Sequence, residues 1–328
     1  MRGLCKVMVA ALIVVGMAEL VGCQYRSKDD AYYLVAPNLS LTYWKTVRDG
    51  FVQAGKEYKV STYVTGPDSY DPKAEADAFS KVVARHPAGI LVSVADAVAL
   101  RDDIASAISA GVPVITVDSD APNSARLYFI GTNNLEVGRL GGKRLVEQLH
   151  GKGNVVFYSI PGQPNLDERL KGYKDVLAGS PGIKVVDVVA TNGDSGTAFD
   201  KAEQYMHATG ANKIDAFVSL ESSSGVALAE VVKRSGATDR VIIAMDANED
   251  TLKLVADGSI DSTIAQKPFT MGYLGLKALD DAHRLPTKGL KSTYVTDQQA
   301  PFPAFVDTGS TLITKYNVSL LTNQPPVN

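Results

Sequence analysis

LVAPNLSLTYW, residues 34–44, is the stretch from which the fold of this chain can be predicted. It begins as a strand and leads into an amphipathic helix over residues 45–58. In a parallel α/β sheet, the loop leaving the carboxyl end of the first strand faces the ligand crevice. Tyr43 and Trp44 are therefore predicted at the crevice mouth, where aromatic rings with polar groups suit a ligand such as a sugar. The alternative is that the two rings only close the hydrophobic core.

Strand and helix patterns then alternate along the chain. Apolar strands are predicted at 32–37, 60–66, 89–94, 112–120, 126–134, 154–160, 184–190, 216–220, 241–246 and 262–266. Helices are predicted between them, with Asp71 and Asp96 as N-caps of two. The pattern runs through one α/β set and then begins again, which predicts two doubly wound parallel-sheet lobes. A ligand of such a molecule lies between the lobes, at the carboxyl ends of the strands.

The N-terminal residues have the features of an export signal. A charged start and an apolar run over residues 7–17 precede Leu20-Val21-Gly22-Cys23, which resembles the lipobox of bacterial lipoproteins. The resemblance implies a signal peptide over 1–22, an acylated Cys23 and a lipid-anchored tether over 23–31, which places the protein extracytoplasmically in the cell envelope. The alternative is an ordinary signal peptide cleaved nearby.

Composition and cysteine count narrow the classes of function. The net charge of -3 argues against a nucleic-acid surface. Of the 2 cysteines, Cys5 lies in the predicted signal, so the mature chain keeps only Cys23 and has no internal disulfide or cysteine metal site. No segment after the signal is apolar for long enough to cross a membrane.

Six motifs, in this order and spacing, resemble type 1 periplasmic sugar-binding proteins, which serve ABC importers for ribose, xylose and related sugars. They are VPVITVDSD (112–120), IGTNN (130–134) with Gly138, RLKGY (169–173), MD (245–246), DGSI (257–260) and IAQKP (264–268) with Gly272. The resemblance covers nearly the whole mature chain and implies the two-lobe fold of that family.

The resemblance also implies ligand-binding residues. Asp118 and Asp246 each follow an apolar strand and would accept hydrogen bonds from sugar hydroxyls; helix capping is the alternative. Arg169 would donate a fork of hydrogen bonds to ring and hydroxyl oxygens, unless it forms a surface ion pair with a neighbouring acid. Gln266 would meet the ligand near a crossing between the lobes, or else be a satisfied amide at a strand end.

The chain departs from the family at ligand-facing positions. Residues 41–44 read Leu-Thr-Tyr-Trp, where ribose binders have Asn-Pro-Phe followed by a second aromatic residue. Ser119 replaces an arginine, and Glu221-Ser222 replaces an asparagine and an aspartate. These changes predict an altered sugar specificity. Glu221 suits an amino or otherwise cationic sugar, or it accepts from another hydroxyl.

By resemblance, the chain crosses between the lobes near 132–133, 266–267 and 295–297, which makes a three-strand hinge. The expected parts are an N-terminal lobe of 32–131 plus 267–295, a C-terminal lobe of 132–266 plus 296–316, and a loose tail over 317–328. Hinge closure around a ligand is the known motion of periplasmic binding proteins.

The predicted function is capture of a monosaccharide by a monomer that delivers it to the permease of an ABC importer, with no cofactor or metal. Catalysis is not expected, because no Gly-x-Gly-x-x-Gly follows the first strand, no P-loop or His-Glu-x-x-His is present and the 4 histidines do not cluster in the sequence. A gene regulator would carry a helix-turn-helix where this chain has its export signal. A sugar receptor that signals to a chemoreceptor or sensor kinase stays open as the alternative.

Overall fold

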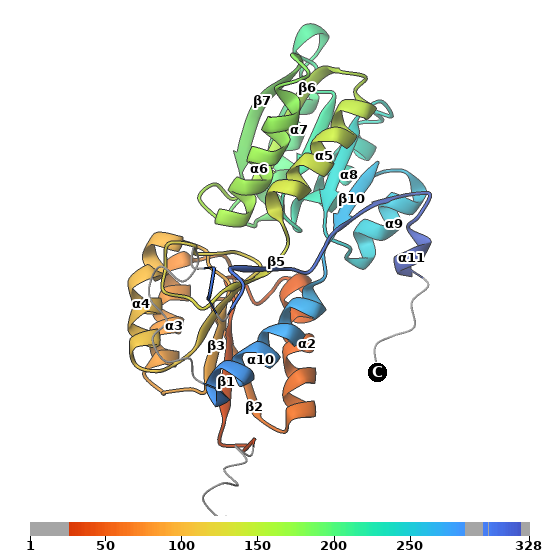
Figure 1. The fold of residues 1–328 in the computed structure, drawn as a ribbon. Helices are drawn as coiled ribbons and strands as arrows, with labels where there is room; N and C mark the ends of the chain where they lie inside the picture. Colours follow the sequence, from red (N-terminus) through yellow and green to blue (C-terminus); the bar gives the residue numbers. More distant parts are fainter. Residues whose placement is uncertain (1–25, 286–297, 301, 323–328) are drawn as a thin grey trace, which may run out of the picture.

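The computed structural model describes residues 26–285, 298–300 and 302–322, and its elements form two lobes (Figure 1). The elements of the N-terminal lobe are β1 (Ala31–Val35), α2 (Thr42–Tyr58), β2 (Ser61–Thr65), α3 (Pro72–Val83), β3 (Gly89–Val92), α4 (Ala97–Ser109), β4 (Val114–Val117), β5 (Phe129–Gly131), α10 (Pro268–Arg284) and β11 (Phe305–Asp307). Those of the C-terminal lobe are α5 (Asn134–Gln148), β6 (Lys152–Ser159), α6 (Pro164–Leu177), β7 (Gly182–Ala190), α7 (Ser195–Met206), η1 (Gly210–Asn212), β8 (Ala216–Ser219), α8 (Ser224–Arg234), β9 (Val241–Met245), α9 (Glu249–Asp257), β10 (Ser262–Ala265), β12 (Thr311–Thr314) and α11 (Ser319–Thr322).

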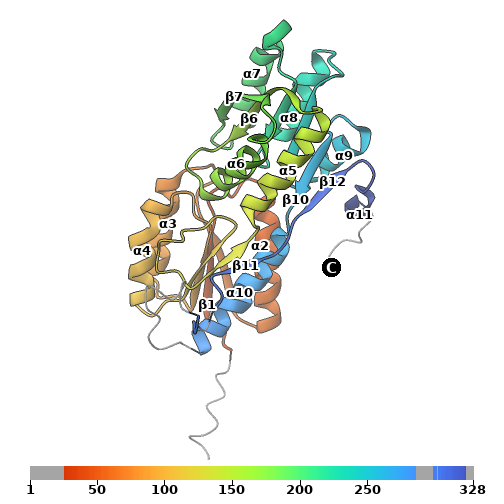
Figure 2. The same cartoon turned by 45° about the horizontal axis from the view of Figure 1, so that its top comes forward.

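Each lobe is organised around a six-stranded sheet. The strand orders are β11-β5-β4-β3-β1-β2 and β12-β10-β9-β8-β6-β7. The strands pair in parallel except for β12, which runs antiparallel to β10 at the edge of the second sheet (Figure 2). The central strands β3, β4 and β8 are buried at every residue, as parallel strands are when helices cover both sheet faces. The predicted fold class is therefore confirmed.

Local helix signals act as the sequence predicts. The Asp71 carboxylate accepts a hydrogen bond from the Ala74 N–H, and Asp96 accepts from two backbone N–H groups, so both acids cap the helices that follow them. Helix α2 begins at Thr42, a few residues earlier than predicted. Tyr43 and Trp44 consequently lie within its first turn.

Within the described residues, three segments join the lobes. Two of them connect β5 to α5 and β10 to α10, at the crossings predicted near 132–133 and 266–267. The third was predicted near 295–297, which lies outside the described residues. Phe305–Asp307 pairs with β5, and the Phe305 ring stacks on that of Phe129 at 5.1 Å. Hence β11 belongs to the first sheet, the last crossing described runs from β11 to β12, and assigning all of 296–316 to the C-terminal lobe was wrong.

The predicted loose tail also begins too early. Val318 is buried in the core of the C-terminal lobe and Leu321 packs against the same cluster, because α11 folds back beside β12. Residues 317–322 are thus part of the lobe, and 323–328 lie outside the described residues. Cys23 and the predicted signal peptide lie outside them as well. Among the described helices, none is both long and apolar enough to cross a membrane.

Candidate functional site

The carboxyl ends of β4 and β9 place two aspartates in the cleft between the lobes. Asp118 and Asp246 each follow the last residue of their strand, and both are almost fully buried. Both have left-handed backbones, with φ of 63° and 71°. This conformation is unfavourable for most residues but is tolerated by aspartate, and such strain is concentrated at functional sites. The main-chain N–H of each aspartate donates to the neighbouring strand, at Ile130 and Ile264, which fixes the turn.

Asp118 is hydrogen-bonded from both sides of the cleft. One carboxylate oxygen accepts from the Tyr43 hydroxyl at 2.6 Å, and the other accepts from the Asn165 side chain of α6 at 3.0 Å. Burial raises the pKa of Asp118, while the charge of Arg169 and the bond from Tyr43 oppose the rise. Burial and the charges of Asp118 and Asp246 raise the pKa of Tyr43 well above its usual range, so the phenol keeps its proton and donates.

Arg169 lies inside the C-terminal lobe, and its hydrogen bonds hold two of the crossings together. Its guanidinium donates to the Asn134 side chain at 2.8 Å, the Leu220 carbonyl at 2.8 Å and the Gln266 side chain at 3.1 Å. The residue is 2% exposed, which rules out the alternative of a surface ion pair. A Cβ at Gly138 would stand 2.0 Å from the Arg169 carbonyl oxygen, so this glycine lets α5 approach α6 where the arginine is held.

Gln266 connects Arg169 to Asp246. Its amide nitrogen donates to the Asp246 carboxylate at 2.8 Å, and its oxygen accepts from Arg169 and from the Thr132 hydroxyl at 2.7 Å. Burial raises the pKa of Asp246 to about 6, and this rise is limited by Arg169 and by the hydrogen bond from Gln266. The bonds of Gln266 thus extend beyond its own strand end to two cleft residues, Arg169 and Asp246, and to Thr132 on the crossing from β5 to α5.

Tyr43 and Trp44 differ in their surroundings. Both line the cleft, and their rings meet edge to face at a centroid distance of 5.4 Å. Trp44 is 5% exposed and belongs to the buried core of the N-terminal lobe, whereas the Tyr43 hydroxyl points at Asp118. The structure therefore combines the two readings of this loop, with Tyr43 directed to the cleft and Trp44 largely in the core.

The carboxylate of Glu221 is occupied by its own loop. It accepts hydrogen bonds from the backbone N–H and hydroxyl of Ser223 and from the hydroxyl of Ser224, at the start of α8. Glu221 is 7% exposed and lines the cleft together with Ser222. The Glu221 carboxylate thus accepts hydrogen bonds at the start of α8, and the residue also forms part of the cleft wall.

Ser119 departs from its predicted place. It is fully buried, and it is not among the residues that line the cleft. The left-handed turn at Asp118 redirects the chain, and the Ser119 carbonyl accepts from the Val94 N–H behind the cleft. In this structure Ser119 therefore lies behind the cleft wall, and a contact with the ligand stays a prediction.

Sequence reasoning missed several cleft residues, of which Asn165 is the most informative. Asn165 and Arg169 are separated by four positions on α6, so they share one helix face, and this spacing is a signal that was present in the sequence. Asn38 and Tyr70 also line the cleft from loops of the N-terminal lobe. Tyr70 packs against the hydrophobic core of the other lobe, a contact that no local pattern predicts.

Comparison with known proteins identifies the family. The family profile described as "Periplasmic binding protein domain" matches residues 32–284. The chain belongs to this family. It is one of non-catalytic solute-binding proteins, which confirms the expectation that the chain is not an enzyme.

Curated relatives of this periplasmic binding protein carry the names of sugars. The ribose import binding protein RbsB of Bacillus subtilis is 22% identical over 250 residues, covering 76% of this chain and 80% of the relative. The D-allose-binding periplasmic protein of Escherichia coli is 23% identical over 264 residues, covering 77% of this chain and 84% of the relative.

Solved structures of similar proteins extend the comparison over most of the chain. A solute-binding protein of Burkholderia graminis in complex with D-arabinose is 28% identical, with a TM-score of 0.80 and coverage of 89% of this chain and 97% of that chain. The arabinose-binding protein AraP of Geobacillus stearothermophilus is 31% identical, with a TM-score of 0.72 and coverage of 89% and 99%.

The cleft of this periplasmic binding protein is rich in acids but has no metal-site geometry. Asp118, Glu221 and Asp246 share it with a single buried cation, Arg169. In the described part of the chain, no group of three or more His, Cys, Asp or Glu side chains is arranged to hold a metal ion. The acids can therefore serve as hydrogen-bond acceptors for an organic ligand.

Proposed function

We propose that this protein captures a neutral monosaccharide between its lobes and delivers it to the permease of an ABC importer. The observation that carries the proposal is a set of hydrogen bonds beside the Tyr43 ring. The buried carboxylates of Asp118 and Asp246, one from each lobe, accept from the amides of Asn165 and Gln266, and the Arg169 guanidinium donates to the Gln266 amide oxygen. Charged acceptors and donors of this kind suit vicinal hydroxyls, and an aromatic ring suits the apolar face of a sugar. The names of the relatives, which include ribose, allose and arabinose, point to the same ligand class.

The charge balance of the cleft supports a neutral ligand over an anionic one. Three carboxylates face one guanidinium, so a phosphorylated or carboxylated sugar would be repelled at close range. An amino sugar would require the Glu221 carboxylate to exchange its hydrogen bonds from Ser223 and Ser224 for bonds to the ligand.

The polar groups already satisfy one another, and a sugar would replace these bonds. Asp118 would exchange Asn165 for a hydroxyl, and Asp246 would exchange Gln266. Binding would then be coupled to rotation of the lobes about the segments that join them, the known motion of periplasmic binding proteins. This proposal includes the two expected lobes, which are 32–131 plus 267–295 and 132–266. Residues 296–316 are divided between these lobes after β11.

The proposal includes an acylated Cys23 that anchors the protein to a membrane on its extracytoplasmic side. Support comes from the lipobox-like residues 20–23 and from the absence of any other cysteine after them. A stable anchor takes more than one acyl chain, which an acylated N-terminal cysteine supplies.

A thermal-shift panel tests the ligand class. Sugars, amino acids and nucleotides are added to the protein, and a monosaccharide is expected to raise the melting temperature. At 100 times its dissociation constant, a ligand stabilises the folded state by about 2.7 kcal/mol. No shift with any sugar, together with a clear shift with an amino acid or a nucleotide, would overturn the proposal.

A further inference from the structure

Strand β2 is the outer strand of the first sheet, and its outer side, here called the β2 edge, has no partner strand in the described part of the chain. On its inner side β2 pairs in parallel with β1. The Ser61 N–H and the Thr65 carbonyl are hydrogen-bonded to main-chain groups on either side of β1. Because the direction of these groups alternates along a strand, the N–H and C=O groups of Thr62 and Val64 face outward.

The β2 edge differs from the other sheet edges in its sequence. Exposed edges are usually protected by charges, prolines, bulges or short strands. The corresponding edge strand of the second sheet, β7, contains Lys184 and Asp187 and has a bulge in its pairing with β6. The remaining edge strands, β11 and β12, have only 3 and 4 residues. β2 reads Ser-Thr-Tyr-Val-Thr, without a charge or a proline, and its register with β1 is uninterrupted. Of the four described edges, β2 alone lacks these protections.

A groove of about 430 Å³ lies beside the β2 edge, between β2 and α3. Helices α2 and α10 cover one face of the first sheet, and α3 and α4 cover the other (Figure 1). The cover is incomplete at β2, where Tyr63 is 48% exposed. The Tyr63 ring stacks on that of Tyr33 with a centroid distance of 4.9 Å. The groove therefore offers an aromatic surface to a side chain that packs there.

Positive charge borders the groove. Lys81 on α3 and Arg85 just after it are exposed and line the groove, and no Asp or Glu is among the described residues that do so. The Arg85 guanidinium lies 6.0 Å from the centre of the Tyr33 ring and donates to the Tyr33 hydroxyl at 3.4 Å. Charge complementarity therefore favours an acidic partner at this groove.

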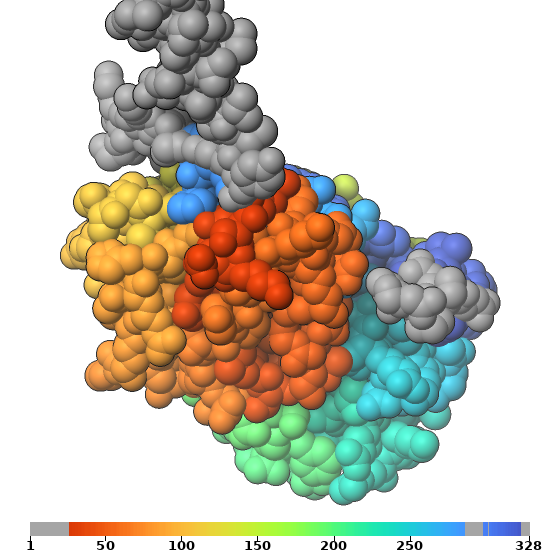
Figure 3. Space-filling view, turned by 90° about the horizontal axis from the view of Figure 1, so that it is seen from below, coloured from red at the N-terminus to blue at the C-terminus, as the bar shows by residue number. Residues whose placement is uncertain are grey.

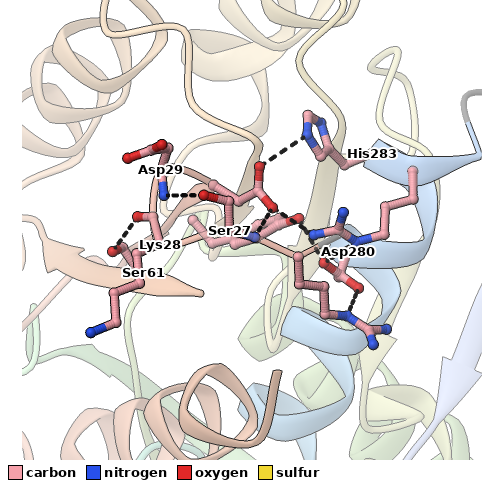
Figure 4. A network of polar contacts seen from close by, with 10 residues as sticks. Ser27, Lys28, Asp29, Ser61, Asp280 and His283 are labelled. Carbon is pink, nitrogen blue, oxygen red and sulfur yellow. Dashed lines mark hydrogen bonds and ion pairs between the residues drawn. The ribbon is translucent and has the colours of Figure 1, made fainter. Parts of the chain in front are cut away.

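The β2 strand is fixed at both ends before a partner binds. At its start, the Ser61 hydroxyl donates to the Lys28 carbonyl at 2.7 Å (Figure 4). Lys28 belongs to the first described residues, which were predicted to be part of a tether and which lie in red against the lobe in the view from below (Figure 3). At its end, the Thr65 carbonyl accepts from the Ala36 N–H at 3.0 Å. Little ordering of β2 is thus required when another strand pairs with it.

We propose that the β2 edge binds an extended, acidic peptide segment of a partner protein, which adds to the first sheet as a further strand. The outward main-chain groups of Thr62 and Val64 pair with the segment, and such main-chain bonds are the source of affinity in strand addition. Acidic side chains on one face of the segment meet Lys81 and Arg85, and an apolar side chain packs on Tyr63. These residues all belong to the N-terminal lobe, so the interaction is independent of the sugar and of lobe closure.

A peptide of defined sequence tests the proposal. The probe is a short fluorescent peptide that alternates Glu and Val, and its binding to the whole protein is followed by anisotropy. It is expected to bind about tenfold more tightly than the same peptide with Lys in place of Glu. Equal binding of the acidic and basic peptides, or no binding of the acidic peptide at millimolar concentration, overturns the proposal.

Methylation of the peptide N–H groups tests the main-chain pairing. Alternate N–H groups of a strand point to opposite sides, so only one of the two alternating sets can face β2. The peptide methylated on one set is expected to lose binding, and the peptide methylated on the other set is the matched control and should keep it. If both methylated peptides bind like the parent, the segment does not add as a strand.

Variants of the protein locate the peptide. Lys81→Gln removes a charge from the groove, and Lys73→Gln removes the same charge from the same helix outside the groove. Lys81→Gln is expected to weaken binding several-fold, and Lys73→Gln to leave it unchanged. Equal effects of the two substitutions would contradict the proposed position of the acidic side chains.

Val64→Pro removes an outward N–H, a change that edge strands tolerate, and is expected to abolish binding. If this variant does not fold, hydrogen exchange of the wild type gives the same information, because the Thr62 and Val64 amides should exchange more slowly when the acidic peptide is bound. Binding that survives in folded Val64→Pro, or unchanged exchange at both amides, contradicts strand addition.

Two other outcomes would also overturn the proposal. If sedimentation shows a dimer that Val64→Pro converts to a monomer, the β2 edge pairs with a second copy of the chain. If the affinity for the peptide changes when a sugar is bound, the peptide contacts the cleft or both lobes. The thermal-shift panel reports on sugar binding in either case, so the proposed function is tested separately.

Discussion

Asp118 of the N-terminal lobe and Asn165 of the C-terminal lobe are joined across the cleft by a hydrogen bond of 3.0 Å. Asp118 is also bonded to Tyr43, so its carboxylate is satisfied while the lobes are together. The nitrogen of the Asn165 amide makes this bond, and its oxygen is buried and without a protein partner among the described residues. That unpaired acceptor and the exchangeable bond beside it mark the place where a hydroxyl ligand gains most.

We predict that Asp118→Ala weakens sugar binding by about 1–3 kcal/mol, because Tyr43, Asn165 and the ligand lose a charged acceptor in a buried site. Calorimetry with the best sugar of the panel measures the loss. Asp68→Ala, at an exposed position of the same lobe, removes the same charge and serves as the control. Equal affinities for the two variants would exclude Asp118 from the binding site.

Glu221→Ala is predicted to lower the melting temperature, because the start of α8 loses the acceptor for Ser223 and Ser224. The loss of such a cap costs about 1 kcal/mol. Affinities for three epimeric sugars, compared between the variant and the wild type, measure its role toward the ligand. A changed rank order is expected if a hydroxyl replaces the bonds from the loop. An unchanged ranking with lower stability would restrict Glu221 to the helix start.

These two acids show how much of the site a sequence can reveal. Asp118 follows an apolar strand, so its place at the cleft could be predicted from the rule for parallel sheets. The bonds of Glu221 depend on how residues 221–224 turn, and the role of Asn165 depends on the approach of the opposite lobe. The bonds of Glu221 leave no local periodic signal in the sequence. The spacing of Asn165 and Arg169 predicts that they share one face of α6, but it does not predict the contact of Asn165 with the other lobe.

The fold, like the site, could be predicted from the sequence only where the signal is local. Long apolar strands and capped helices were found from periodicity, and the two-lobe architecture followed from their alternation. Strand β11 has three residues and exists because Phe305 and its neighbours pair with β5, far away in the sequence. Its position, and with it the last crossing, was therefore misplaced. Residues 26–30 are predicted as part of a tether, whereas the structure bonds Arg26 to Asp280, which lies 254 positions away and leaves no local signal.

Glu75 is predicted to make stability depend on pH. It is fully buried on α3, accepts from the Ala95 N–H at 2.8 Å, and its burial raises the pKa from 4.5 to about 8. The stability that this proton contributes is fully present below pH 4.5 and is lost as the pH rises toward 8, because only the unfolded state releases the proton in that range. The slope is about 1.4 kcal/mol per pH unit at most.

Glu75→Gln keeps an oxygen for Ala95 but cannot ionise, so its stability relative to the wild type should rise between those two pH values and level off above them. Denaturant unfolding at a series of pH values measures the difference. Parallel stability curves for the two proteins across this range would show that Glu75 does not titrate there.

Cys23→Ala is predicted to release the protein from membranes. The wild type should fractionate with membranes and incorporate labelled fatty acid, and the variant should do neither, because Cys23 is the one thiol after the predicted signal. Cell fractionation and fatty-acid labelling are the measurements. A soluble, unlabelled wild type would contradict the lipobox interpretation.

Tyr43 and Trp44 are predicted to separate binding from stability. Tyr43→Ala removes the hydroxyl bonded to Asp118 and the ring at the cleft, so it should weaken sugar binding more than it lowers the melting temperature. Trp44→Ala opens a cavity in the core of the N-terminal lobe, which should cost about 3–5 kcal/mol of unfolding free energy with a smaller change in affinity. Trp44 is the only tryptophan, so its emission should respond saturably to the sugar with the calorimetric dissociation constant. If Trp44→Ala abolishes binding in a protein that melts like the wild type, Trp44 is the ring that meets the ligand. If neither substitution weakens binding, the ligand lies elsewhere in the cleft, because a sugar between Asp118 and Asp246 must contact the first turn of α2.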